Sequence, residues 1–483
     1  MSAANHIAKV VVAGGGITAW SAAAALKKRI PSLDVRLIET AATADALADR
    51  IISTLPSISG FHGDIGLTDA DVITRAGSGL RLGTMFQGWA GGQPDYIHAY
   101  GDCGAAVGVV PFHQLWVRHS RENALPPFDR FSAAAELARS GSNAQVASQP
   151  VGLQLTFKRY AEMMRAYALH LGVHAQTGLI TDVELGTDSG FIDALLLADG
   201  GQVRGDLFVD CTGAGSLMQQ RLDTPFVDWS AWLPCDRVLL QETGPDPAAV
   251  SLDRVAALPV GWRWTASSPQ AASAGVVYSS AHAKHDEIAR ELETAAEPLA
   301  IPQGRRRDFW VRNCVAIGDA AVTVEPLEWT NLHLVHSQLD RLVAMMPGRD
   351  CAAIELAQFN RECAAEADRV RDFLCLHYVC SSRPEPFWQE AAAITPPPSL
   401  EHTLALFTER GRLPYYQEET FTRDSWLTVL LGQGIRPRRI DPLADLVSPQ
   451  EAGQAFAAMR QSLQSFNLPA AREPAELNPH GIR

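Results

Sequence analysis

The chain begins with the hydrophobic pattern of a strand, a turn and a helix. Residues 6–13 (HIAKVVVA) form a short apolar, β-branched run, which predicts a buried parallel strand. A glycine cluster follows, after which the alanine-rich stretch 20–29 predicts a helix and residues 35–39 (VRLIE) predict a second strand. Together these elements predict one βαβ unit and hence an α/β fold.

Further along, apolar runs alternate with polar and glycine-rich segments. Residues 41–149 are rich in Gly, Ser and Pro and are expected to be less regular. The pattern then predicts a helix over 155–172 and a β-hairpin region over 180–199, while 206–211 (DLFVDC) and 310–317 (WVRNCVAI) predict buried strands. We also expect mixed strands and loops over 220–300, a helix from Thr330, mainly helices in the C-terminal third and a frayed tail after Asn467.

Composition and charge narrow the class of protein. Hydrophobic residues make up 47% of the 483 residues and charged residues 20%, which supplies large cores and excludes an intrinsically disordered chain. The net charge of −13 argues against nucleic acid or an anionic membrane as partner. Eleven tryptophans against eight tyrosines indicate a large core or a site that stacks flat molecules.

The apolar and cysteine patterns bear on location. The sequence has no run of about 18 apolar residues, so we expect neither a signal peptide nor a membrane span. None of the eight cysteines forms a Cys-x-x-Cys pair, which favours buried reduced thiols over disulfides and predicts no metal site. We therefore expect a cytoplasmic protein.

The glycine cluster after the first strand fits the dinucleotide-binding pattern G-x-G-x-x-G/A. Gly14 would permit a tight turn, Gly16 would let the backbone approach a pyrophosphate, and Ala19 is small enough for the helix to pack on the sheet. The pyrophosphate would lie on the helix N-terminus, at the segment of Ile17 and Thr18, where free N–H groups and the helix dipole favour an anion.

The end of the second strand supports a dinucleotide site, and two distant segments favour FAD over NAD. Glu39 ends the second strand and could accept a hydrogen bond from a ribose hydroxyl. The alternative for the glycine cluster is an ordinary glycine-rich turn without a ligand, which the neighbouring strand, helix and Glu39 disfavour. Far downstream, Gly318-Asp319 follows a strand, and in two-dinucleotide-binding flavoproteins such a pair meets the pyrophosphate and ribityl chain of FAD. Residues 210–213 (DCTG) resemble the turn that closes over the adenine side of FAD in the same flavoproteins.

We therefore expect an α/β fold with an FAD-binding, Rossmann-like flavoprotein module and a smaller, largely helical substrate module. The expected division places the main part of the FAD module at 1–225 with inserted loops at 41–149, a substrate-side sheet with loops at 226–300, a return segment of the FAD module at 301–345, the helical substrate module at 346–470 and a tail at 471–483.

Over about residues 7 to 440 the chain resembles the flavin-dependent tryptophan halogenases. The likeness rests on 10–20 (VVVAGGGITAW), 206–213 (DLFVDCTG), 322–330 (VTVEPLEWT), 371–388 and 426–437. It implies FAD, reduced by a separate flavin reductase, together with oxygen and a halide such as chloride or bromide. In this family the halide becomes hypohalous acid beside the flavin, a lysine directs the halogen onto an aromatic carbon, and a glutamate stabilises or deprotonates the ring intermediate.

The resemblance also places the catalytic residues. The family's glutamate falls on Glu328, and its lysine falls on Arg81 in GSGLRLGTMFQGW. Arginine keeps the charge and the donors, but its very high pKa prevents neutral-amine chemistry. His98 is a third candidate, as a general base if it lines the pocket. The structural alternatives are that Glu328 caps a helix or forms an ion pair, that Arg81 pairs with Glu328, and that His98 is a core histidine.

The pocket expected from the resemblance is partly altered. Its residues are Tyr100, Trp262, Trp264, Trp329, Thr330 and Trp426. The two tryptophans of the family's Trp-x-Trp-x-Ile-Pro motif are kept without the Ile-Pro pair, and they could instead be core residues. Residues 329–331 (WTN) stand where the family has Ser-Thr-Gly, whose backbone helps hold halide, and Trp426 stands where a tyrosine clamps the amino-acid end of tryptophan.

These residues predict an FAD-dependent monooxygenase or halogenase-like oxidoreductase that acts on an aromatic, indole-like small molecule. The altered positions disfavour chlorination of free tryptophan. The alternative is a catalytically degraded flavin-binding sensor or partner-binding subunit. A homodimer is an assembly that the sequence leaves open.

Overall fold

The computed structural model describes residues 5–41, 46–50, 52–121, 123–141, 146–241, 243–246, 249–270, 272–292, 294–417 and 419–464. The tail expected after Asn467 lies outside these residues. The chain forms two compact units, each assembled from three stretches of sequence. The first comprises Met1–Ser78, Leu155–Ser230 and Leu299–Arg369, and the second comprises Gly79–Gln154, Ala231–Pro298 and Val370–Arg483.

The first unit is built on a mainly parallel sheet. Its strand order is β19 (Trp310–Val311), β20 (Cys314–Ala316), β11 (Leu207–Cys211), β1 (Lys9–Gly14), β2 (Asp34–Glu39) and β7 (His174–Thr177). The β-branched side chains of Val10, Val11 and Val12 are fully buried, as expected of a strand covered on both faces. The register places Gly14 beside both Cys211 and Glu39, so the carboxyl ends of β1, β2 and β11 meet at one edge.

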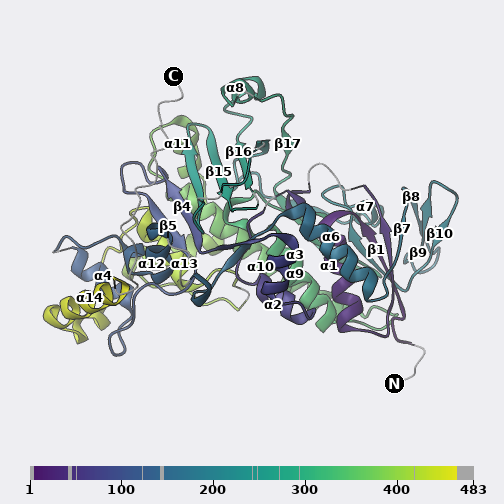
Figure 1. Ribbon diagram of the computed structural model, residues 1–483, viewed down its shortest axis with the longest axis horizontal. Helices are drawn as coiled ribbons and strands as arrows, with labels where there is room; N and C mark the ends of the chain where they lie inside the picture. Colours follow the sequence, from purple (N-terminus) through teal and green to yellow (C-terminus); the bar gives the residue numbers. More distant parts are fainter. Residues whose placement is uncertain are drawn as a thin grey trace. The chain divides into compact units, whose positions relative to one another are not determined.

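Helices pack closely on this sheet. Helix α1 (Gly16–Arg29) starts directly after β1, and its alanines 22–25 are fully buried, because small side chains allow close approach to the strands. It also packs against α6 (Phe157–His170) and α9 (Asn331–Ala344), as Figure 1 shows beside β1. The other elements of this unit are η2 (Leu47–Asp49), α2 (Ile58–Asp64), α3 (Asp69–Ala76), β8 (Ile180–Leu185), β9 (Ile192–Leu197), β10 (Gln202–Val203), α7 (Leu217–Arg221), β12 (Phe226–Asp228), β17 (Leu299–Ala300), β18 (Gly304–Arg306), η5 (Gly318–Ala320), β21 (Val322–Thr323) and η6 (Leu327–Trp329).

The second unit carries a different, mixed sheet. The strands of this sheet that belong to the second unit run in the order β13 (Arg237–Gln241), β16 (Ala272–Tyr278), β15 (Gly261–Ser267), β14 (Asp253–Leu258), β4 (Gly83–Gln87) and β5 (Tyr96–Ala99). Neighbours are antiparallel except β14 and β4, which are parallel. The short strands β3 (Gly79–Arg81) and β6 (Gly152–Gln154) form a separate pair.

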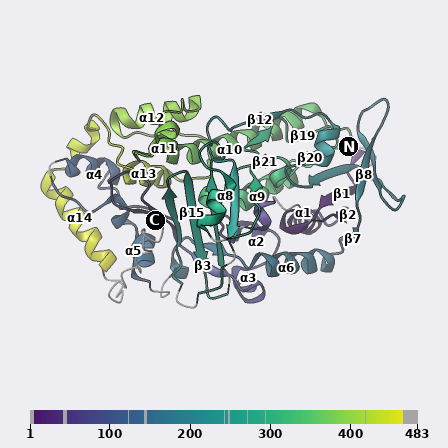
Figure 2. The same cartoon turned by 90° about the horizontal axis from the view of Figure 1, so that it is seen from above.

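Helices complete the second unit. They are α4 (Phe112–Ser120), η3 (Phe128–Phe131), α5 (Ala133–Ser140), η4 (Val146–Ser148), α8 (His285–Glu291), α11 (Pro386–Ala392), α12 (Pro398–Arg410), α13 (Arg423–Gly432), η7 (Pro442–Leu446) and α14 (Pro449–Gln464). Helix α10 (Ala353–Val379) passes from the first unit into the second. Figure 2 shows α14 alongside α4, against which it packs.

Most sequence-based expectations for the elements are confirmed, with two corrections. The predicted strand over 310–317 is two short antiparallel strands, because the chain turns at Arg312, whose φ is +54°. The stretch 41–149, expected to be irregular, contains α2, α3, β3, β4, β5, α4 and α5. Glycines and prolines keep these elements short, so each is too brief to give a strong periodic signal.

All eight cysteines are buried. Across the described parts of the chain, none of the helices combines the length and the apolar character that a bilayer crossing requires. The same residues contain no cluster of three or more His, Cys, Asp or Glu side chains placed to hold a metal ion.

Candidate functional site

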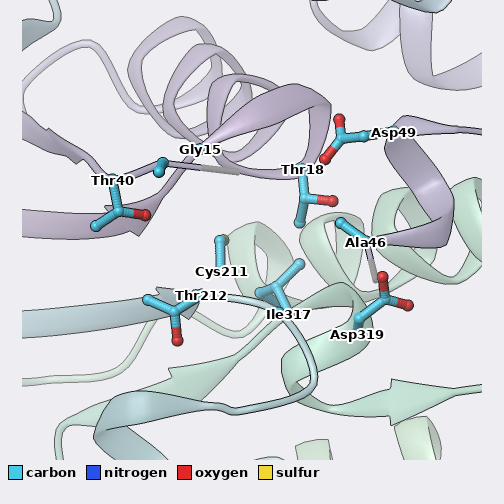
Figure 3. Close-up of a pocket in the computed structure, with 11 residues that line it drawn as sticks. Gly15, Thr18, Thr40, Ala46, Asp49, Cys211, Thr212, Ile317 and Asp319 are labelled. Carbon is cyan, nitrogen blue, oxygen red and sulfur yellow. The ribbon is translucent and has the colours of Figure 1, made fainter. Parts of the chain in front are cut away.

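A small polar cavity lies at the carboxyl edge of the first unit's sheet. It is lined by the start of α1, the residues after β2, Asp49 on η2, the turn after β11 and residues of η5, including Asp319. Figure 3 shows the carboxylate of Asp49 beside the first turn of α1, with Thr18, Thr212 and Asp319 around the same space. Strand order reverses at β1, which lies between β2 and β11, and open α/β sheets bind ligands at such a point.

Two glycines shape this edge. Gly14 has a φ of +148°, and a Cβ there would clash with the carbonyl oxygen of Cys211 on the neighbouring strand. Gly16 has a φ of +73°, and a Cβ there would clash with the Asp49 carboxylate. Both backbone positions therefore require glycine for their conformation as well as for space.

Replacing Gly14 with alanine is expected to destabilise the first unit by about 1–3 kcal/mol, because the new methyl group overpacks the β1–β11 pair. Gly63→Ala in α2 is the matched control, since a Cβ at Gly63 meets no atom within 4 Å. Urea-induced unfolding of both variants measures the difference. Equal stability of the two variants would show that the β1–β11 contact is not the constraint.

The first turn of α1 presents backbone N–H groups to the cavity. Its N-cap, Gly15, provides no side-chain hydrogen bond, and the turn contains no acidic residue of its own. The N–H of Ile17 donates to Oδ1 of Asp49, which comes from a separate segment. Ala19 is fully buried, and Thr18 lines the cavity. The predicted glycine-rich turn, strand and helix are thus present in the expected geometry.

The remaining predicted cofactor residues surround this edge. Gly318 has a φ of +67° and its N–H donates to Oε1 of Gln338 at 2.9 Å, which fixes the turn that carries Asp319. Glu39 ends β2, where its carboxylate lies 3.6 Å from the Arg165 guanidinium, and the next residue, Thr40, lines the cavity.

Buried Asp210 organises the turn after β11. Its carboxylate accepts hydrogen bonds from the backbone N–H groups of Thr212 at 3.1 Å, Met218 at 2.8 Å and Gln219 at 3.2 Å. These bonds satisfy the buried charge and hold residues 210–213 in a fixed turn. The N–H groups at the start of α1 and the left-handed glycines supply the donors and the backbone conformation that a dinucleotide pyrophosphate needs, and in this structure the Asp49 carboxylate lies at that helix N-terminus.

Glu328 lies in the first unit on an unusual backbone. Glu328 and Trp329 have φ values of +62° and +61°, the left-handed region that non-glycine residues rarely adopt, and both side chains are buried. The N-cap position of α9 is Thr330. The Oγ1 of Thr330 and the Oδ1 of Asn331 are buried without a hydrogen-bond partner in the structure.

Arg81 lies in the second unit in a buried ion pair. Its Nε donates to Oδ2 of Asp253, its Nη2 donates to Thr84 Oγ1 at 2.5 Å, and Tyr100 lies under its guanidinium at 5.2 Å. Gln154 donates to the other Asp253 oxygen at 2.6 Å, and both charged side chains are fully buried. Asp253 is thus a charge partner of Arg81 within the second unit.

The other predicted pocket residues of the second unit lie among aromatic side chains. The His98 ring lies 5.7 Å from Phe373 and 6.2 Å from Phe421. Trp262 donates to Tyr378 Oη at 3.0 Å, and Trp264 donates to Ser273 Oγ at 3.1 Å. Trp426 packs edge-on against Phe373 and donates to Glu419 at 3.3 Å. All four predicted residues are buried, so they contribute to the core of this unit.

The structure therefore brings the predicted residues together in two groups. The cofactor residues, Glu328, Trp329 and Thr330 belong to the first unit, and Arg81, His98, Tyr100, Trp262, Trp264 and Trp426 belong to the second. Sequence reasoning missed Asp253 and Asp49. The alternation of β14 places Asp253 on the same buried face as Val255, a signal that could have identified it, whereas no local pattern identifies Asp49.

Comparisons with known proteins cover nearly the whole chain. The family model for tryptophan halogenase matches residues 9–449. A flavin-dependent halogenase structure from Brevundimonas sp. BAL3 is 34% identical, with a TM-score of 0.89 and coverage of 97% of this chain and 98% of that one. A second, from Xanthomonas campestris, is 32% identical, with a TM-score of 0.90 and coverage of 96% and 97%. A tryptophan 6-halogenase from Streptomyces toxytricini is 27% identical over 94% of each chain. The chain thus belongs to the tryptophan halogenase family of flavin-dependent enzymes.

Proposed function

We propose that this protein is an FAD-dependent oxidoreductase that uses reduced flavin and oxygen to halogenate or oxygenate an aromatic, indole-like substrate. The observation that carries the proposal is the glycine-shaped cradle at the carboxyl edge of the β2–β1–β11 sheet. It supplies the strand, turn and helix N-terminus that a dinucleotide pyrophosphate requires. Membership of the family supports FAD as the dinucleotide.

In this proposal different residues of the chain bind the cofactor and handle the proton at the substrate. The N–H groups at the start of α1, around Gly16, Ile17 and Thr18, bind the pyrophosphate, while the Gly318-Asp319 turn approaches it from the η5 side. The reduced cofactor supplies the electrons that activate oxygen. Glu328 faces the aromatic substrate and holds or accepts a proton there, and its strained backbone fixes the carboxylate in one direction.

Arg81 is less suited to halogen delivery than a lysine. Its guanidinium is always charged, and Asp253, Thr84 and Tyr100 already surround it. We therefore propose that Arg81 is a positioning residue, which holds its neighbouring side chains in the interior of the second unit in place. We also propose that the substrate is something other than free tryptophan. Chloride or bromide remains the proposed halide, with the backbone at Trp329 and Thr330 as the expected site.

A turnover assay tests the proposed reaction. Purified protein receives FAD, a flavin reductase with its reductant, oxygen, chloride or bromide, and a panel of indoles, and products are analysed by mass spectrometry. A halogen isotope pattern supports halogenation, and a gain of one oxygen atom supports monooxygenation. Tight FAD binding without any product overturns the enzymatic proposal and favours the sensor.

Arg81→Lys is expected to leave the yield of halogenated product unchanged. The Asp253 carboxylate would hold the new ammonium in its charged form, since an opposite charge nearby raises the pKa of an amine. The double variant Arg81→Lys with Asp253→Asn removes the carboxylate that stabilises the charged ammonium, and it serves as the comparison. A tenfold or greater gain from Arg81→Lys alone would show that the lysine is the missing part.

The proposed partners follow from the same chemistry. A separate flavin reductase would deliver the reduced cofactor. A cytoplasmic location would give the protein access to the reductase and to reduced FAD. Light scattering on the purified chain distinguishes a monomer from the proposed homodimer.

A further inference from the structure

The carboxylate of Asp49 lies at the N-terminus of α1, where an anionic ligand would bind. Its Oδ1 accepts the N–H of Ile17, and its carboxylate fills the space beside Gly16 that a Cβ would otherwise take. Asp49 lies 33 residues downstream of Gly16 in the chain. It belongs to η2, which packs against α1. A helix N-terminus favours any anion that reaches it, whether it is a phosphate or a side-chain carboxylate.

The cavity beside this contact is small. With Asp49 in place, the polar cavity has a volume of about 10 Å³. That is roughly the space that a single water molecule needs, far below what a pyrophosphate requires. Among the described residues that line the cavity, Asp49 accepts a hydrogen bond from the first turn of α1, at the N–H of Ile17.

We propose that Asp49 is an internal competitor for the pyrophosphate of FAD, so that the cofactor binds only when this carboxylate leaves the N-terminus of α1. The inference rests on the proposed FAD site and adds a control of its affinity. The two anions would exclude each other because they need the same N–H groups and repel each other when both are charged.

The charge of Asp49 sets the direction of the effect. Burial raises the pKa of Asp49 to about 6, although the hydrogen bond from Ile17 and the nearby Arg50 favour the charged form. The pyrophosphate of FAD is a diester and stays ionised throughout this range. Because burial disfavours the charged form at this position, the carboxylate leaves it for water more easily than the neutral carboxyl group does. Below pH 6 the departing group must release its proton, which weakens FAD binding, whereas above pH 6 this cost is absent and FAD should bind more tightly.

Other ionisable groups face η2 and must be separated from Asp49. Asp319 and Cys211 line the same cavity, and burial raises the pKa of Cys211 well above its usual value. Helix α9, which also packs on η2, carries His333, His336, Asp340 and Arg341. Burial keeps the pKa of His336 well below its usual value, and His333 contacts Glu366 at 3.1 Å. The experiment must therefore separate the effect of Asp49 from that of these neighbouring groups.

The experiment measures the dissociation constant of oxidised FAD by titration calorimetry between pH 5 and pH 8. The proteins are the full wild-type chain, Asp49→Asn and Asp49→Ala. Asp188→Asn, which removes an exposed carboxylate of the same unit on the β8–β9 turn, is the control for net charge. Circular dichroism confirms that each variant is folded.

We expect the wild-type dissociation constant to fall by about tenfold from pH 5 to pH 8, because binding releases one proton from Asp49. Asp49→Ala, which removes the competing group, should bind FAD at least about tenfold more tightly than wild type at pH 8. Both Asp49 variants should show little pH dependence, while Asp188→Asn behaves as wild type. Equal or weaker binding by Asp49→Ala would overturn the inference, and so would a pH dependence that persists in Asp49→Asn. If no form of the protein binds FAD, the proposed function itself fails.

Discussion

Asp253→Ala is expected to destabilise the second unit by about 3–5 kcal/mol, because it leaves the buried guanidinium of Arg81 without its carboxylate. Both side chains are fully buried, so water cannot replace the lost partner. The substitution also leaves the amide of Gln154 without the acceptor that it contacts at 2.6 Å. Urea-induced unfolding followed by tryptophan fluorescence measures the change, with many buried tryptophans as reporters.

The double variant Arg81→Met with Asp253→Leu tests whether charge or packing determines the stability at this site. Replacing both charges with apolar groups of similar volume is often neutral or stabilising, so the double variant should recover most of the stability. A loss below about 1 kcal/mol for Asp253→Ala would contradict the buried ion pair. A double variant as unstable as the single variant would show that packing, rather than charge, dominates there.

Glu328→Gln is expected to lower turnover by about 10²–10⁴-fold, the range typical of removing a positioned general acid or base. Glutamine keeps the size of the side chain and its tolerance of the same backbone, so FAD binding and folding should remain unchanged. The measurement is the rate of product formation on whichever indole the turnover assay identifies, together with FAD affinity.

Glu325→Gln is the matched control, because both glutamates are buried in the same short segment of the first unit. The carboxylate Oε2 of Glu325 accepts a hydrogen bond from Nε2 of Gln303 at 3.4 Å, and the backbone N–H of Glu325 donates to Oε1 of Gln303 at 3.0 Å. These contacts serve the packing of this segment. We expect its amide variant to retain most of the turnover. A similar loss in both variants would assign Glu328 a structural role, and activity within tenfold of wild type for Glu328→Gln would remove it from the reaction.

Local parts of the fold could be predicted well from the sequence. The β1–α1–β2 unit, the β8–β9 hairpin and β11 follow from apolar runs bounded by glycines, because those patterns reflect burial along a single element. The cradle at Gly14 and Gly16 was predictable for the same reason, since the turn and the helix that it starts are contiguous in the chain.

Contacts between distant segments could not be predicted in this way. Arg81 and Asp253 are 172 residues apart, and only the register of β14 beside β4 brings them together. Asp49 reaches α1 from a short helical turn that has no periodic pattern. Similarly, the aromatic neighbours of His98 come from α10 and a loop far along the chain, so its burial depends on tertiary packing alone.

The division of the first unit among three stretches of sequence has a consequence for synthesis of the chain. Strands β1, β2 and β11 are complete by residue 211, yet β20, which covers the open edge of β11, is not made until residues 314–316. A parallel sheet with such distant partners folds slowly, and an unpaired strand edge is prone to aggregation. We therefore expect the emerging chain to depend on chaperones during the interval in which β11 awaits its neighbour.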